Sequence, residues 1–235
     1  MDLLHRRRFL PVCLALLALV AFEAVAEAHG VSRRDASFVE SITGAAIGPF
    51  LYLGAKHMVT GYDHLLFLVG VIFFLYRLKD VVLYVSLFTI GHSLTLLGGV
   101  LGGIHANAYI IDAIIGLSVV YKGFENLGGF KYFFGRQPDT RAAVLIFGLF
   151  HGFGLATKLQ ELALTQEGLV TNIVSFNIGV ELGQMLALTF VLIGLTWWRT
   201  RPGFLRHAFM TNTLLMTGGF LLVGYQLSGY MLSAQ

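Results

Sequence analysis

The sequence predicts an all-α protein, a polytopic membrane bundle of about six transmembrane helices that follows a cleavable signal peptide. The 235-residue chain is 56% hydrophobic and only 12% charged, against roughly 25% charged residues in soluble domains. Its 28 glycines and 4 prolines are typical of closely packed transmembrane helices. The apolar runs are much longer than the strands of an outer-membrane barrel. These observations exclude a soluble enzyme, a disordered chain and a disulfide scaffold.

Charge also limits the partners. The formal net charge of +3 comes from scattered Lys and Arg, and no basic face is present that could follow a phosphate backbone. We therefore expect no nucleic-acid partner, and the lipid bilayer is the expected environment.

The first 28 residues are typical of an export signal, which predicts a signal peptide over 1–28. A charged stretch, Arg6–Arg8, precedes an apolar run over 9–22 that is too short to span a bilayer comfortably. Small residues that end at Ala28 fit a cleavage site, and an uncleaved anchor helix is the alternative. The only cysteine, Cys13, lies inside this segment, so the mature protein would have no thiol for a disulfide or a metal.

A short exported segment, 29–47, then leads into a single transmembrane domain over 48–235. Its hydrophobic segments are predicted at 48–76, 81–101, 107–128, 141–160, 169–198 and 208–231. The first segment is mixed, with a short interfacial helix or half-helix at 48–58 before the strongly apolar 61–76.

Loop charges predict the orientation in the membrane. Most Lys and Arg of the loops lie in 77–80, 129–141 and 199–207, whereas 102–107 and 158–168 contain only Lys158. The positive-inside rule and the export signal therefore agree on one topology. It places the protein in the bacterial inner membrane with both mature termini in the periplasm.

Ionisable residues within the apolar segments are costly in a bilayer and are usually functional. His64, His92 and His151 each lie about 15–18 Å from the predicted cytoplasmic end of their helix, at about 1.5 Å per residue. We therefore expect the three to share a layer near the membrane midplane. Asp63 adjoins His64, and His57 lies two turns further out on a similar helix face.

Neutral imidazole together with carboxylate suits a divalent transition metal such as nickel, cobalt, zinc, copper or iron. The expected metal ligands are His57, Asp63, His64, His92, His151 and Glu181, supported by Asn177 and Gln184. Each intramembrane histidine has a structural alternative, a hydrogen bond to a carbonyl of another helix. For Lys122 and Glu125, spaced i and i+3, a structural ion pair near the cytoplasmic end is the preferred interpretation.

Several of these residues lie in motifs that resemble the HupE/UreJ family. The run His57-Met58-Val59-Thr60-Gly61-Tyr62-Asp63-His64 matches H-x-x-x-G-x-D-H and is similar to the first family signature. Phe150-His151-Gly152 resembles the start of the second signature, and residues 91–95 and 176–184 also resemble the family pattern. Met58 stands where the family has Pro, and 153–157 lacks a further His and Glu of the second signature, which indicates a divergent branch.

The resemblance implies a secondary permease for nickel or a related metal, associated with hydrogenase and urease accessory genes. It also implies that His57, Asp63, His64 and His151 handle the metal. We therefore expect inward movement of a divalent metal rather than catalysis. The alternatives are an intramembrane metal-dependent enzyme, and a metal chaperone or assembly factor that binds metalloenzyme maturation partners.

Overall fold

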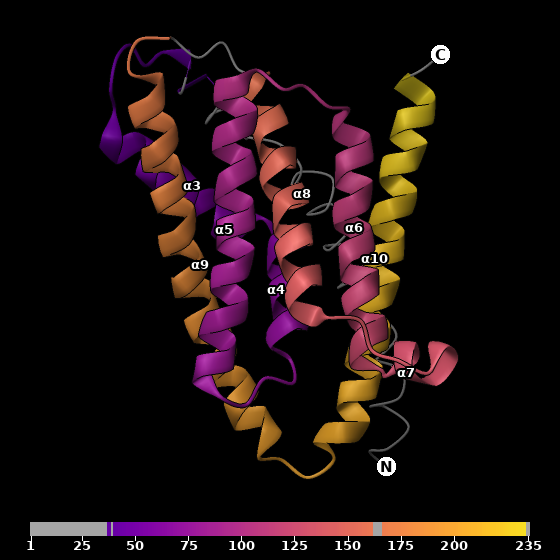
Figure 1. The fold of residues 1–235 in the computed structure, drawn as a ribbon. Helices are drawn as coiled ribbons and strands as arrows, with labels where there is room; N and C mark the ends of the chain where they lie inside the picture. The colour runs from indigo at the N-terminus through magenta and orange to yellow at the C-terminus, as the bar shows by residue number, and fades with distance from the viewer. Residues whose placement is uncertain (1–36, 39, 162–165, 234–235) are drawn as a thin grey trace, which may run out of the picture.

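The computed structural model describes residues 37–38, 40–161 and 166–233, and its regular elements there are all helices (Figure 1). The all-α prediction is thereby confirmed. The helices in chain order are α3 (Ile47–Thr60), α4 (Tyr62–Ile72), α5 (Leu78–Gly102), α6 (Ala108–Asn126), α7 (Gly129–Phe134), α8 (Thr140–Gln160), α9 (Leu169–Arg199) and α10 (Phe204–Ser233). The predicted signal peptide, 1–28, lies outside the described residues.

Four helices are long and apolar enough to cross a membrane: α5, α8, α9 and α10. The 19-residue α6 is a continuous helix, and its apolar sequence includes three acidic or basic residues, Asp112, Lys122 and Glu125. The first predicted segment is divided between α3 and α4. About six spans therefore stays a prediction, with four of the helices supported by length and composition.

The first predicted segment breaks at Gly61, close to the predicted boundary between a half-helix and a strongly apolar stretch. Gly61 ends α3 by donating its N–H to the carbonyl of His57 at 2.7 Å, and α4 begins at the next residue. A Cβ at Gly61 would lie 2.9 Å from that carbonyl oxygen and 3.3 Å from Nδ1 of His64. A side chain here would therefore collide with the turn that brings His57 and His64 close together.

The bundle is built from three close helix pairs around a short central helix (Figure 1). The pairs are α3 with α9, α5 with α8, and α6 with α10, and α4 contacts α3, α5, α6, α9 and α10. We call one extremity of the bundle the α7 end: there α4, α6 and α9 terminate and α5, α8 and α10 begin (Figure 1). The central position of α4 means that its side chains can meet those of most other helices.

Glycine allows the backbones within each pair to approach closely. In the α5–α8 pair, a Cβ at Gly152 would collide with the carbonyl oxygen of His92, and one at Gly148 with that of Phe88. In the α3–α9 pair, Gly54 and Gly179 stand in the same relation to the facing backbone. This is the packing that small residues provide between membrane helices, and it sets the depth of His92 relative to α8.

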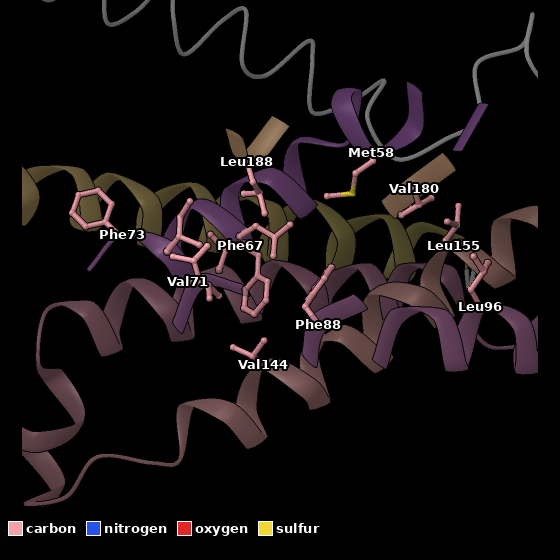
Figure 2. Close-up of a cluster of buried hydrophobic side chains, with 14 of the residues drawn as sticks. Met58, Phe67, Val71, Phe73, Phe88, Leu96, Val144, Leu155, Val180 and Leu188 are labelled. Atoms are coloured by element: carbon pink, nitrogen blue, oxygen red, sulfur yellow. The ribbon is translucent and has the colours of Figure 1, made fainter. Parts of the chain in front are cut away.

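An apolar core runs along the bundle, from Phe73 near the α7 end of α4 to Leu96 and Leu155 further along α5 and α8 (Figure 2). Phe67 and Phe88 lie in its middle, and neither is exposed. This core surrounds the polar residues of α4 with aromatic and aliphatic groups, so any polar atom left there must find a partner inside the protein.

Arg199, in the last turn of α9, anchors the end of α4. Its guanidinium donates to the carbonyls of Ile72, Phe73 and Leu75 at 2.6–2.9 Å. A cation at a helix C-terminus satisfies free carbonyls and complements the helix dipole. The far end of the histidine-bearing helix is therefore held by a residue distant in sequence.

Candidate metal site

Asp63 fixes the orientation of His64 at the first turn of α4. Its Oδ1 accepts the backbone N–H of His64 at 2.8 Å and faces Nδ1 of the same residue at 2.9 Å. Both side chains are buried, at 5% and 3% exposed. Because Nδ1 must donate to the carboxylate, Nε2 of His64 keeps its lone pair. Carboxylate–imidazole pairs orient metal-binding histidines in this way.

His151 of α8 is oriented by its own helix. Its Nδ1 lies 2.8 Å from the carbonyl oxygen of Phe147, one turn earlier. Since a carbonyl only accepts, Nδ1 carries the proton and Nε2 is again the atom with a free lone pair. His151 is completely buried.

His64 lies at the centre of the cluster. Its ring centroid is 4.8 Å from that of His151, 5.6 Å from that of His92 and 5.4 Å from that of His57. The four rings come from four different helices: α8, α5, α3 and α4 itself. Tertiary packing thus gathers histidines that are up to 94 positions apart in the sequence, as their residue numbers show. We call these four residues the histidine cluster.

The Nε2 atoms of all four histidines are buried and have no hydrogen-bond partner within the described part of the chain. An unpartnered buried nitrogen costs free energy unless something binds it. Among residues 37–38, 40–161 and 166–233, no three His, Cys, Asp or Glu side chains already stand in a metal-binding geometry. The rings are therefore neighbours whose nitrogens do not yet converge on one point.

Three phenylalanines pack against the histidine cluster on the side of the α7 end. Phe67, Phe88 and Phe147 lie one helical turn from His64, His92 and His151 respectively. The His151 ring is 5.2 Å from that of Phe67 and 5.1 Å from that of Phe88. We call this layer the phenylalanine floor. Sequence reasoning missed it, although the four-residue spacing of Phe88 with His92 and of Phe147 with His151 was a visible signal.

The remaining predicted site residues lie on another seam. Asn177 and Gln184 of α9 bridge to Ser93 and Thr89 of α5, at 2.9 and 3.0 Å. Glu181 accepts a long hydrogen bond from Nδ2 of Asn177, at 3.5 Å. The structure thus brings five of the six predicted ligands together and leaves Glu181 beside Asn177. Its assignment as a metal ligand stays a prediction.

Lys158 differs from its predicted place in a loop. It belongs to α8, its side chain is 14% exposed, and it pairs with Asp112 of α6 at 3.0 Å. The predicted segment 141–160 agrees with α8, which continues to Gln160, so the loop that the charge count began at 158 starts too early. A signal was available, since both residues lie a short way inside the same end of the bundle, where opposite charges on neighbouring helices pair.

Lys122 and Glu125 form the predicted i,i+3 ion pair, with Nζ and Oε2 2.5 Å apart. Glu125 also accepts from Gln137 at 2.8 Å and from the hydroxyl of Thr140. We call this group the Lys122–Glu125 network. It lies where α6 and α8 approach α7, and along α8 Thr140 is three turns from His151.

Fold and site together define a multi-pass helical membrane protein with a cluster of four histidines, two of them oriented through Nδ1. A family model described as HupE / UreJ protein matches residues 33–234. The chain therefore belongs to the HupE/UreJ family, as its motifs indicated. No curated protein and no solved structure matches it.

Proposed function

We propose that this protein is a permease that carries a divalent transition metal, nickel or cobalt, into the cell across the bacterial inner membrane. The HupE/UreJ family is linked to nickel- or cobalt-related transport and to urease maturation. The observation that carries the proposal is the set of four buried, unpartnered Nε2 atoms around His64. In this proposal the mature termini lie in the periplasm.

The separation of each outer ring from His64 is close to what two imidazoles on one ion require. With Nε2 about 2.1 Å from a metal and the ring centre about 1.2 Å behind it, two imidazoles on one ion have centroids roughly 4.7–5.4 Å apart. The centroids around His64 are separated by 4.8, 5.4 and 5.6 Å. Small rotations about the side-chain torsions would then turn the nitrogens toward a common point.

The donor set supports a substrate that is held transiently. Neutral imidazoles suit nickel and cobalt, and a carboxylate behind one of them raises its basicity. A permease must bind its ion strongly enough to capture it and weakly enough to release it. Protonation of the imidazoles would weaken metal binding. These ligands are therefore compatible with release of the ion on one side of the membrane.

The experiment is metal flux into proteoliposomes loaded with a fluorescent chelator. We expect the wild type to take up Ni²⁺ or Co²⁺ and His64→Ala to lose at least 90% of that flux, because His64 contacts all three other rings. The matched control is His207→Ala, which removes an exposed histidine. His151→Ala provides a second site variant if His64→Ala does not fold.

Two results would overturn the permease. One is wild-type protein that binds metal and gives no flux in vesicles of either orientation, which would favour a metal chaperone for metalloenzyme maturation. The other is one equivalent of metal that survives prolonged chelation, which would favour an enzyme with a resident ion.

A further inference from the structure

The short aromatic helix α7 projects sideways from the end of the bundle (Figure 1). Three successive side chains of this helix, Tyr132, Phe133 and Phe134, are 83%, 69% and 69% exposed. Two basic residues, Lys131 and Arg136, flank the aromatic run and are also exposed. We call these five residues the α7 patch. Exposed aromatic side chains gathered in one place indicate an interaction site.

The outward position of the α7 patch is built into the fold. Phe130 anchors α7 on α6, because its ring centroid lies 4.8 Å from that of Tyr121 and 4.9 Å from that of Phe124. Gly128 and Gly135 stand on either side of α7 with φ of +75° and +71°, a left-handed conformation that favours glycine. These two turns and the Phe130 contact hold the rest of α7 away from the bundle.

The length of α8 places α7 at the surface of the bilayer. The 21 residues of α8 extend about 31 Å at 1.5 Å per residue, close to the roughly 30 Å thickness of the apolar core. The first residue of α8 therefore lies at one border of that core. Only residues 135–139 separate it from the end of α7, so α7 lies at the level of the lipid headgroups.

Other side chains at the α7 end show the same combination of aromatic ring and cation. Cζ of Arg199 lies 4.6 Å from the centre of the Tyr76 ring, and Cζ of Arg201 lies 4.4 Å from the centre of the Trp197 ring. Tyr76 and Trp197 are both largely exposed. Exposed Trp and Tyr gather at the headgroup level of membrane proteins, which agrees with the depth that the length of α8 gives for α7.

The chemistry of the α7 patch matches one class of lipid. Aromatic rings at this depth pack at the boundary between headgroups and acyl chains, and neighbouring cations attract lipid phosphates. In a zwitterionic lipid the headgroup supplies its own cation to the phosphate, whereas an anionic phospholipid leaves that charge for the protein. We propose that the α7 patch binds an anionic phospholipid: its three aromatic rings insert at the bilayer surface, and the cations of Lys131 and Arg136 contact the phosphate group. This lipid site does not depend on the proposed transport of metal.

The test measures lipid binding by native mass spectrometry of the purified protein in detergent. The protein is mixed with equal amounts of a phosphatidylglycerol and a phosphatidylcholine that have the same acyl chains. We expect the wild type to bind phosphatidylglycerol preferentially, and Lys131→Gln/Arg136→Gln to bind it about tenfold more weakly. The matched control, Arg77→Gln/Lys79→Gln, removes two exposed cations at the start of α5, at the same end of the bundle, and should keep the wild-type affinity.

A second variant tests the aromatic part of the α7 patch. Tyr132→Ser/Phe134→Ser should weaken the binding of both lipids, because it removes rings and leaves the cations in place. Unchanged lipid binding in this variant would overturn the proposed insertion of the rings.

Three further results would overturn the proposal. Equal losses in the two charge variants would mean that lipid binding follows the total charge of the α7 end. Displacement of the lipid by excess glycerol 3-phosphate would mean that the cations take a soluble phosphate. Equal binding of the two lipids by the wild type would remove the anionic preference and favour a soluble protein as the partner of the exposed rings. Because no nickel or cobalt is present, each of these results leaves the permease untouched, and absence of metal flux leaves the lipid site untouched.

Discussion

The Lys122–Glu125 network and the histidine cluster are both buried polar groups in an apolar bundle, and they differ in how fully they are bonded. In the network, the ammonium of Lys122 meets Glu125, whose other oxygen accepts from Gln137 and Thr140. In the histidine cluster, all four Nε2 atoms lack a partner in the described residues. Burial is similar: the side chains of Lys122 and Glu125 are 8% and 4% exposed, and His64 and His92 are 3% and 2% exposed.

The difference separates an internally satisfied group from one that, in the proposed function, binds a ligand. Buried polar groups are normally hydrogen-bonded, and those that are not need an explanation. The polar groups of the network bond to one another, so the network contributes to the stability of the folded protein. The histidine cluster leaves its Nε2 atoms free and holds two of the rings through Nδ1. In the proposed function, those Nε2 atoms gain their partner when a metal ion binds. Mutations should therefore affect stability in one region and metal affinity in the other.

The largest expected effect is on stability, in the Lys122–Glu125 network. Glu125→Ala leaves the ammonium of Lys122 buried without a counter-charge, and such a loss costs about 3–5 kcal/mol. Reversible unfolding in detergent should show this decrease, while the metal affinity of the folded protein is unchanged. In the double variant Lys122→Met/Glu125→Gln most of the stability should return, since no unpaired charge remains. A fall in metal affinity in the folded Glu125→Ala protein would contradict the distinction.

A smaller effect, on affinity, is expected in the histidine cluster. Asp63→Asn keeps the size of the side chain but removes the charge that faces Nδ1 of His64. Loss of such a supporting partner weakens metal binding by about 10–100-fold. Titration calorimetry with Ni²⁺ or Co²⁺ measures this change, and Asp139→Asn, at the exposed start of α8, is the matched control. Unchanged affinity in Asp63→Asn would remove the carboxylate from the proposed mechanism.

The smallest effect concerns the support of α4, which carries His64. Arg199→Lys replaces a planar fork that contacts three carbonyls by a single ammonium that cannot reach all of them. We expect a loss of about 1 kcal/mol in the free energy of unfolding, with metal affinity within threefold of wild type. A larger drop in affinity than in stability would mean that the position of α4 itself controls the site, and would weaken the separation between the two regions.

Much of the fold was predictable, because its helices are local. Apolar length and polar breaks located every long helix, with boundaries near those observed, and Gly61 marked the division between α3 and α4. Apolar length placed Lys158 inside the segment 141–160, whereas the count of loop charges assigned it to 158–168; the structure shows that it pairs with a carboxylate on another helix. That partner, Asp112, is 46 positions away in the sequence.

The site was predictable only in part. Depth along each helix follows from a constant rise per residue, so His64, His92 and His151 could be assigned to one layer. Depth does not give rotation about the helix axis relative to a neighbour. Glu181 as a metal ligand stays a prediction for that reason, and the contact that the structure gives it is with Asn177, whose amide donates to Ser93 on α5.

The sequence by itself determined the all-α membrane class, the positions of the helices and the family, and it supplied the candidate metal ligands. These follow from composition, from local periodicity and from short motifs. Only the tertiary structure decided which helices pair, because the pairing depends on glycine surfaces that meet across the bundle. It also decided that the imidazoles of three other helices lie around His64 above a phenylalanine floor, and that Asn177 and Gln184 bridge α9 to α5. Both depend on how each helix is rotated against its neighbours, which is set by the packing of side chains far apart in the chain.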